Sequence, residues 1–128
     1  AIDPAKGKAV IAVDGNDVYV CKGKNGLTKI SNGQATQVFE CPEFTDSKDS
    51  KVKVKGNCNG VAVDNQYIYI ACGSYGLVVL DKATGKEVCH RKAYTGKSAN
   101  YVSVDANGYI YVAYGQSRIQ VFKLAQTK

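Results

Sequence analysis

The sequence predicts an all-β protein made of three repeats, each a small antiparallel sheet of four strands, and three observations lead to this fold class. Short segments rich in Val, Ile and Tyr alternate with turns rich in Gly, Asn and Asp, which is the pattern of strands and hairpins. No long window has helical periodicity. One phrase also recurs three times along the 128 residues. Repeats of this kind are typical of β-propellers, so we expect propeller blades.

The three repeats share one order of elements. A short apolar strand ends in Asp, a tight turn leads to a Tyr-bearing strand, and a Gly-containing turn precedes a second apolar strand. Val63 lies 50 residues after Val13, and Val104 lies 41 after Val63, close to the ~40–50 residues of a usual blade. The equivalent residues are Asp14, Asp64 and Asp105, then Tyr19, Tyr69 and Tyr111, then Gly23, Gly73 and Gly115, then Leu27, Leu77 and Ile119.

The repeats divide the chain without a linker between domains. We expect blade-like units at about 8–55, 58–97 and 98–124, within a single propeller segment that covers 1–128. The first unit is the longest, because the polar stretch CPEFTDSKDSKVKVK follows its strands. In an extended strand, the KVKVK run at 51–55 would place its three lysines on one face. We interpret it as a solvated hairpin or a lysine-protected edge strand.

The second repeat predicts its strands most clearly. They are expected at about 60–64, 67–72, 76–81 and 86–91. Successive residues of a strand point to opposite faces, and both faces of the strand at 67–72 are apolar. This predicts a sheet packed on each side of it. The two sets of residues are Tyr67, Tyr69 and Ala71 on one face, and Ile68, Ile70 and Cys72 on the other.

The third repeat is expected to be incomplete. After the strand that ends near Leu124 only four residues follow, so we expect this repeat to lack its fourth strand. Three blades are also fewer than the ~4–8 that close a propeller. We therefore expect the chain to form part of a larger or multi-chain propeller, in which the remainder of the propeller or another chain completes the ring.

The five cysteines give two interpretations. No CxxC spacing occurs, and the single His, His90, adjoins Cys89, so on a strand the two side chains point to opposite faces and suit neither a metal site nor a nucleophilic pair. The thiols are expected to be buried as small hydrophobic groups. The alternative is a disulfide between Cys41 and Cys58, which would close the polar insertion.

The polar motifs predict turns rather than a catalytic or metal site. Asp14, Asp64 and Asp105 would lie at one end of the sheets, where Asp is favoured because it hydrogen-bonds local backbone; the alternative role is cation binding. No P-loop and no GxSxG motif is present. We expect no catalytic residue, no metal and no cofactor. We also expect no membrane span, because no apolar run reaches ~20 residues.

The segment from Tyr69 to Asp81 reads Tyr-Ile-Ala-Cys-Gly-Ser-Tyr-Gly-Leu-Val-Val-Leu-Asp. It resembles the LVIVD repeat of bacterial β-propellers, whose units carry the phrase Y-x-A-x-G-x-x-G-L-x-V-x-D. The resemblance extends over all three repeats, although Ser31 replaces the final Asp in the first and Arg118-Ile119 replaces Gly-Leu in the last. It implies an extracytoplasmic protein, in the periplasm or at the cell surface, and it supplies no catalytic residue.

These features predict a noncatalytic scaffold or recognition module that binds a protein or a glycan through loops on one face. An exposed Tyr75 would suit stacking on a sugar. No aromatics flank the KVKVK run, so we expect no nucleic-acid partner. One alternative is part of a propeller enzyme, a hydrolase or oxidoreductase, whose catalytic residues lie mainly on blades outside this chain; another is a structural subunit of a surface assembly. Equivalent turns nominate as binding residues Lys24, Asn25, Ser74, Tyr75, Gln116 and Arg118.

Overall fold

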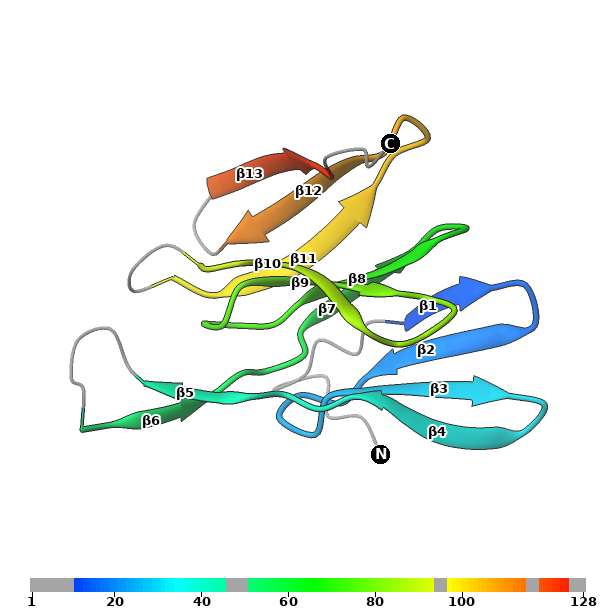
Figure 1. Cartoon of the computed structure of the whole chain (residues 1–128), viewed down its shortest axis with the longest axis horizontal. Helices are drawn as coiled ribbons and strands as arrows, with labels where there is room; N and C mark the ends of the chain where they lie inside the picture. Colours follow the sequence, from blue (N-terminus) through cyan, green and yellow to red (C-terminus); the bar gives the residue numbers. More distant parts are fainter. Residues whose placement is uncertain (1–10, 46–50, 94–96, 115–117, 125–128) are drawn as a thin grey trace.

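The computed structural model describes residues 11–45, 51–93, 97–114 and 118–124. Every helix or strand assigned in these ranges is a β-strand, so they hold no helix able to cross a membrane. All neighbouring strands pair antiparallel, and three sheets follow one another through the molecule, with the second between the first and the third (Figure 1). The predicted all-β class with small antiparallel sheets is confirmed.

The first two sheets have four strands each, in sequence order. The first consists of β1 (Ile11–Asp14), β2 (Asp17–Cys21), β3 (Leu27–Ser31) and β4 (Gln34–Phe39). The second consists of β7 (Gly60–Val63), β8 (Tyr67–Ala71), β9 (Leu77–Asp81) and β10 (Glu87–Arg91). The strands of the second sheet begin and end within one residue of the predicted positions, because alternating apolar residues and Gly- or Asp-containing turns define both ends.

The third sheet has three strands within the described residues: β11 (Ala99–Val104), β12 (Tyr109–Tyr114) and β13 (Arg118–Lys123). The polar insertion of the first repeat forms a separate hairpin of β5 (Glu43–Thr45) and β6 (Lys53–Lys55). Phe44 lies opposite Val54 in this hairpin, while Lys53 is exposed. The interpretation of the lysine-rich run as a solvated hairpin is therefore confirmed.

Two hydrophobic cores fill the spaces between the three sheets. The core between the first and second sheets includes Ile68 and Ile70, and the core between the second and third sheets includes Tyr69 and Ala71. Strand β8 is thus buried on both faces, as its two apolar faces predicted.

The junctions between sheets repeat in space. Gly23, after β2, forms an isolated antiparallel bridge with Cys58, and Gly73, after β8, forms the same bridge with Ala99. Gly73 lies 50 residues after Gly23, and Ala99 lies 41 after Cys58. The packing of one sheet onto the next therefore follows the same periods as the sequence.

The outward faces of the first and third sheets are apolar. On β1, Ile11 is 51% and Val13 is 69% exposed; on β13, Ile119 is 63% and Val121 is 54% exposed. Val121 lies opposite the exposed Tyr111 in the ladder between β12 and β13. Within the described ranges no further sheet covers either face, and the three sheets do not close into a ring.

Candidate binding groove

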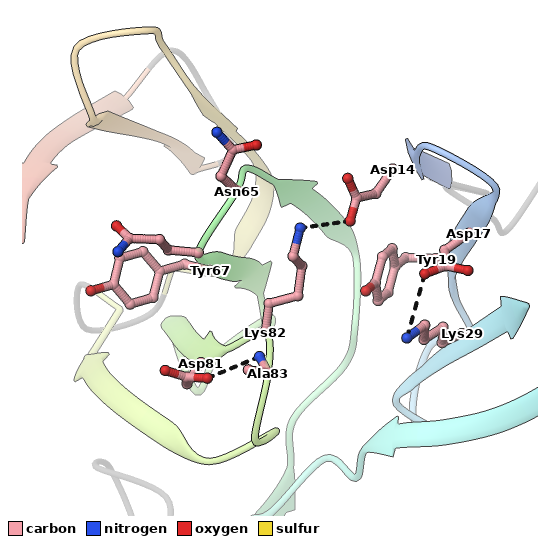
Figure 2. A pocket seen from close by; sticks show the side chains of 10 residues that line it. Asp14, Asp17, Tyr19, Lys29, Asn65, Tyr67, Asp81, Lys82 and Ala83 are labelled. Atoms are coloured by element: carbon pink, nitrogen blue, oxygen red, sulfur yellow. Dashed lines mark hydrogen bonds and ion pairs between the residues drawn. The ribbon is translucent and has the colours of Figure 1, made fainter.

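A polar groove of about 610 Å³ lies between the first and second sheets. It opens at the end of the sheets that carries the β1–β2, β7–β8 and β9–β10 turns. Figure 2 shows the side chains of both sheets that face it. The groove is lined by Asp14, Asp17, Tyr19 and Lys29 from the first sheet, and by Asn65, Gln66, Tyr67, Asp81, Lys82 and Ala83 from the second.

Lys82 connects the two sheets across the groove. Its position is fixed by the turn after β9, in which Asp81 Oδ1 accepts hydrogen bonds from the N–H groups of Ala83 (2.9 Å) and Thr84 (3.0 Å). Lys82 Nζ donates to Asp14 Oδ2 at 2.8 Å, an ion pair that Figure 2 shows reaching from the second sheet to the first. The same ammonium donates to the Asp64 carbonyl at 3.0 Å. The hydrogen bond to Asp14 raises the pKa of Lys82.

A second ion pair lies on the wall formed by the first sheet. Lys29 Nζ is 3.5 Å from Asp17 Oδ2, and both side chains are partly exposed. The pKa of Asp17 is lowered, first by a hydrogen bond with the Ser31 side chain and then by the charge of Lys29. The lowered pKa keeps the Asp17 carboxylate ionised at neutral pH beside the Lys29 side chain.

The aspartates at the strand ends mainly organise turns. Asp64 Oδ1 accepts hydrogen bonds from the N–H groups of Gln66 (2.9 Å) and Tyr67 (2.8 Å), and Asp105 Oδ1 accepts those of Asn107 (2.9 Å) and Tyr109 (3.0 Å). The turn role predicted for these two aspartates is confirmed. Asp14 differs, because its carboxylate binds Lys82 in the groove.

Each turn aspartate also holds the repeat tyrosine of its sheet. The Tyr69 hydroxyl donates to Asp64 Oδ2 at 2.5 Å, and the Tyr111 hydroxyl donates to Asp105 Oδ2 at 2.8 Å. Burial is the main cause that raises the pKa of Tyr69, with the Asp64 hydrogen bond second. For the exposed Tyr111 the hydrogen bond comes first. In the second and third sheets the recurring Asp and Tyr of the sequence therefore bind each other across the tight turn.

Tyr67 lies at the rim of the groove, and its side chain packs on the Tyr69 side of β8, toward the third sheet. It is half-buried at the start of β8, and its ring packs against Tyr69 in an edge-to-face contact with the ring centres 6.1 Å apart. Beside it, Asn65 and Gln66 are exposed in the β7–β8 turn. An aromatic face with neighbouring amides, carboxylates and ammonium groups can contact the apolar and the polar parts of one ligand together.

The residues nominated from the sequence lie away from this groove. Lys24 and Asn25 are exposed in the β2–β3 turn, Ser74 is exposed in the β8–β9 turn, and Arg118 is exposed at the start of β13. None of these four lines the groove, and neither does Tyr75. Gln116 lies outside the described residues.

The Tyr75 ring is covered by neighbouring aromatic rings. It is half-buried, and its ring stacks on His90 with the ring centres 3.8 Å apart and also contacts Phe44 of the β5–β6 hairpin at 5.4 Å. His90 Nε2 lies 2.7 Å from the Tyr75 carbonyl oxygen. The expectation of an exposed aromatic at this turn is corrected: the insertion hairpin and β10 cover it.

The cysteines form no bridge in the structure. Cys41 and Cys58, for which a disulfide is the alternative interpretation, are both free thiols, as are the other three cysteines. Four of the five thiols are buried, in agreement with the first interpretation. In the part of the chain that the structure describes, no group of three or more His, Cys, Asp or Glu side chains is placed to hold a metal ion.

The sequence patterns place Tyr19 and Tyr67 on strands and indicate a turn at Asp14, and they do not combine these residues into one site. The available signal was that Asp14 and Asp81 each end a strand at the same end of their sheets, and that Lys82 follows Asp81. What the sequence did not show is that a turn of the second sheet lies against the first sheet.

No family model matches the chain, and no curated protein matches it in sequence, so the repeat family it resembles is not identified by these comparisons. Among solved structures, the crystal structure of the computationally designed Ika4 protein is similar to it. The two chains share 9% identity, superpose with a TM-score of 0.52, and match over 98% of this chain and 96% of that chain. At this identity the likeness concerns the fold alone.

Proposed function

We propose that this chain is a noncatalytic recognition module, a segment of a β-propeller with LVIVD-like repeats, and that it binds a glycan in the groove between its first two sheets. The proposed location is extracytoplasmic, in the periplasm or at the cell surface. The observation that carries the proposal is the lining of the groove, which brings amide, carboxylate and ammonium groups of two sheets together, with Tyr67 at its rim.

This lining suits a sugar. Sugar hydroxyls donate and accept hydrogen bonds, and the groove presents acceptors in Asp81 and donors in Lys82, with both kinds in Asn65 and Gln66. The apolar face of a sugar ring packs well on an aromatic ring such as that of Tyr67. Among the residues that line the groove, three aspartates are offset by two lysines, which favours a neutral or weakly charged ligand over a polyanion.

The enzyme alternative fits the groove less well. A general acid needs a carboxyl group whose pKa is raised toward neutrality. The hydrogen bond with Ser31 and then the charge of Lys29 instead lower the pKa of Asp17, and Asp14 is held by Lys82. These contacts support binding rather than acid–base chemistry.

The binding proposal is tested with three neutral oligosaccharides, maltotriose, cellotriose and N-acetylchitotriose, titrated into the protein by calorimetry. We expect at least one to bind, and Asn65→Ala to weaken its Kd roughly five- to tenfold, because one hydrogen bond contributes about 1 kcal/mol. Asn25→Ala is the matched control, since Asn25 is also an exposed turn residue but lies at the opposite end of the sheets.

Two outcomes would contradict the proposal. One is that none of the three oligosaccharides binds. The other is that Asn25→Ala weakens binding while Asn65→Ala does not, which would move the site to the turns nominated from the sequence.

The propeller part of the proposal is supported by the two apolar outward faces. In a stack of blades each sheet is covered on both sides, and here the faces that carry Val13 and Val121 lack a cover within the described residues. Head-to-tail contact would place the third-sheet face of one copy against the first-sheet face of the next, which buries both. We propose that, when the chain is studied by itself, a second copy of the chain covers each of these apolar faces.

Native mass spectrometry tests this closure. We expect an oligomer whose mass is a multiple of 13.7 kDa, and we expect Val121→Lys to shift it to the monomer because the new ammonium group would have to be buried at the contact. Val88→Lys is the matched control: Val88 is 51% exposed, close to the 54% of Val121, but lies on β10 of the middle sheet. A stable, compact wild-type monomer would rule out the incomplete ring.

A further inference from the structure

Four of the five cysteines meet in the core between the first and second sheets. Cys21 ends β2, Cys41 follows β4, Cys58 precedes β7 and Cys72 follows β8. Their side chains are almost fully buried, with exposed fractions of 6%, 3%, 1% and 0% in that order. Four segments that are distant in sequence therefore bring their thiols to one place.

The four thiols are arranged as two pairs. Cys72 Sγ lies 3.9 Å from Cys41 Sγ. Cys58 is held beside Cys21, because its backbone N–H donates to the carbonyl of Gly23 at 2.8 Å, two residues beyond Cys21. The neighbouring Cys21 side chain, as a hydrogen-bond partner, and burial raise the pKa of the Cys58 thiol. The sulfur partner of Cys41 is thus Cys72, and that of Cys58 is Cys21.

We propose that these four thiols are oxidised to two buried disulfides, Cys41–Cys72 and Cys21–Cys58, which join the first sheet to the second. Sulfurs 3.9 Å apart must approach by roughly 2 Å to reach the ~2.05 Å of an S–S bond, a distance that side-chain rotation can supply. In the described part of the chain no group of three or more His, Cys, Asp or Glu side chains is placed to hold a metal ion. This favours cross-links between pairs of thiols.

Cys41 is the sulfur best suited to begin the reaction. The hydrogen bond from the Cys72 thiol lowers the pKa of Cys41 to about 7, despite the opposing effect of burial. The same hydrogen bond, together with burial, raises the pKa of Cys72. Since the thiolate is the nucleophile in disulfide chemistry, Cys41 attacks first and Cys72 resolves the intermediate.

The proposed oxidant is a small-molecule disulfide such as oxidised glutathione. The Cys41 thiolate attacks one of its sulfurs, which breaks the S–S bond, releases one small thiolate and leaves a mixed disulfide. Cys72 then gives up its proton, and its sulfur displaces the second small thiolate from Cys41. Two protein thiols are oxidised and one disulfide is reduced to two thiols; Cys21 and Cys58 react likewise. Because all four thiols are almost fully buried in the folded protein, the exchange needs a late, partly open state of the chain in which Cys41 and Cys72 already lie side by side.

Cys89 provides an internal control. It lies on β10, is only partly buried, and packs with the other core, between the second and third sheets. A single partly buried thiol away from the cluster should stay reduced. The odd number of cysteines then follows from two cross-links and one free thiol.

The experiment refolds the full chain in reduced and oxidised glutathione, quenches with acid, and alkylates the free thiols under denaturing conditions. We expect the chain to have lost the mass of four hydrogen atoms, and non-reducing peptide mapping to show Cys41–Cys72 and Cys21–Cys58, with Cys89 alone alkylated. The oxidised chain should melt on the order of 10 °C above the reduced chain. Cys72→Ala should free Cys41 for alkylation and leave Cys21–Cys58 in place, whereas Cys89→Ala should change neither cross-link.

The wild-type peptide map decides the question even if Cys72→Ala does not fold. A map showing Cys41–Cys58 would overturn the pairing, and so would five alkylated thiols after oxidative refolding. Addition of Zn²⁺ to the reduced chain is the remaining test. Retention of one equivalent with four protected thiols and no cross-links after refolding would replace the disulfides by a metal site. None of these readouts depends on glycan binding.

Discussion

Replacing Gly76 with alanine is expected to destabilise the protein by about 3 kcal/mol or more. Gly76 has a φ of +105°, and a Cβ built there would lie 2.0 Å from the Arg91 carbonyl oxygen and 2.7 Å from the Ala93 nitrogen. The obstacle is the backbone at the end of β10 and just after it, which cannot rotate away as a side chain can. Guanidinium unfolding monitored by circular dichroism measures the change.

Gly85→Ala is the matched control for this substitution. Gly85 also has a positive φ, +76°, but nothing lies within 4 Å of a Cβ built on it. We expect Gly85→Ala to lower the free energy of unfolding by only about 1–2 kcal/mol, the cost of the left-handed conformation for a residue with a Cβ. Equal losses for the two variants would show that the close approach at Gly76 is unimportant. Gly26, the equivalent residue of the first sheet, would place its Cβ 2.0 Å from the Phe39 carbonyl oxygen, so Gly26→Ala should behave like Gly76→Ala.

Replacing Ile70 with alanine is expected to cost about 2–5 kcal/mol. Ile70 is fully buried at the centre of the core between the first and second sheets, and it lies opposite Val61 and Val78 on the neighbouring strands. Truncation removes three carbon atoms from a site closed on all sides by strands, so the surroundings can fill the cavity only in part. Equilibrium unfolding in guanidinium measures the loss.

Val88→Ala is the control for the core substitution, because Val88 lies on β10 of the same sheet but is 51% exposed. It should change the free energy of unfolding by less than about 0.5 kcal/mol. An equal loss of unfolding free energy for Ile70→Ala and Val88→Ala would contradict the packing of the second sheet against the first, because that packing buries Ile70.

Much of the fold could be predicted because its signals are local. The strand at 67–72 has two apolar faces, and the structure buries both, since the side-chain period of a strand is two regardless of what packs on it. The same holds for the turn aspartates Asp64 and Asp105, which bind backbone N–H groups only two to four residues away.

The candidate site could not be predicted in the same way. The expected site used Tyr75, whose exposure depends on Phe44 and His90, residues from two other elements. The groove uses Lys82, whose partner Asp14 is 68 residues away in the chain. Neither contact leaves a periodic trace in the sequence.

The sequence by itself determined the three repeats, their strands, and which side chains share a face, because these depend on local periodicity and turn chemistry. Only the tertiary structure decided which polar ends of the sheets meet as a groove, and that the sulfur of Cys41 lies next to that of Cys72. The physical reason is that the packing of one sheet on the next is set by the fit of whole apolar faces. That fit places residues of different repeats beside each other without any spacing rule along the chain.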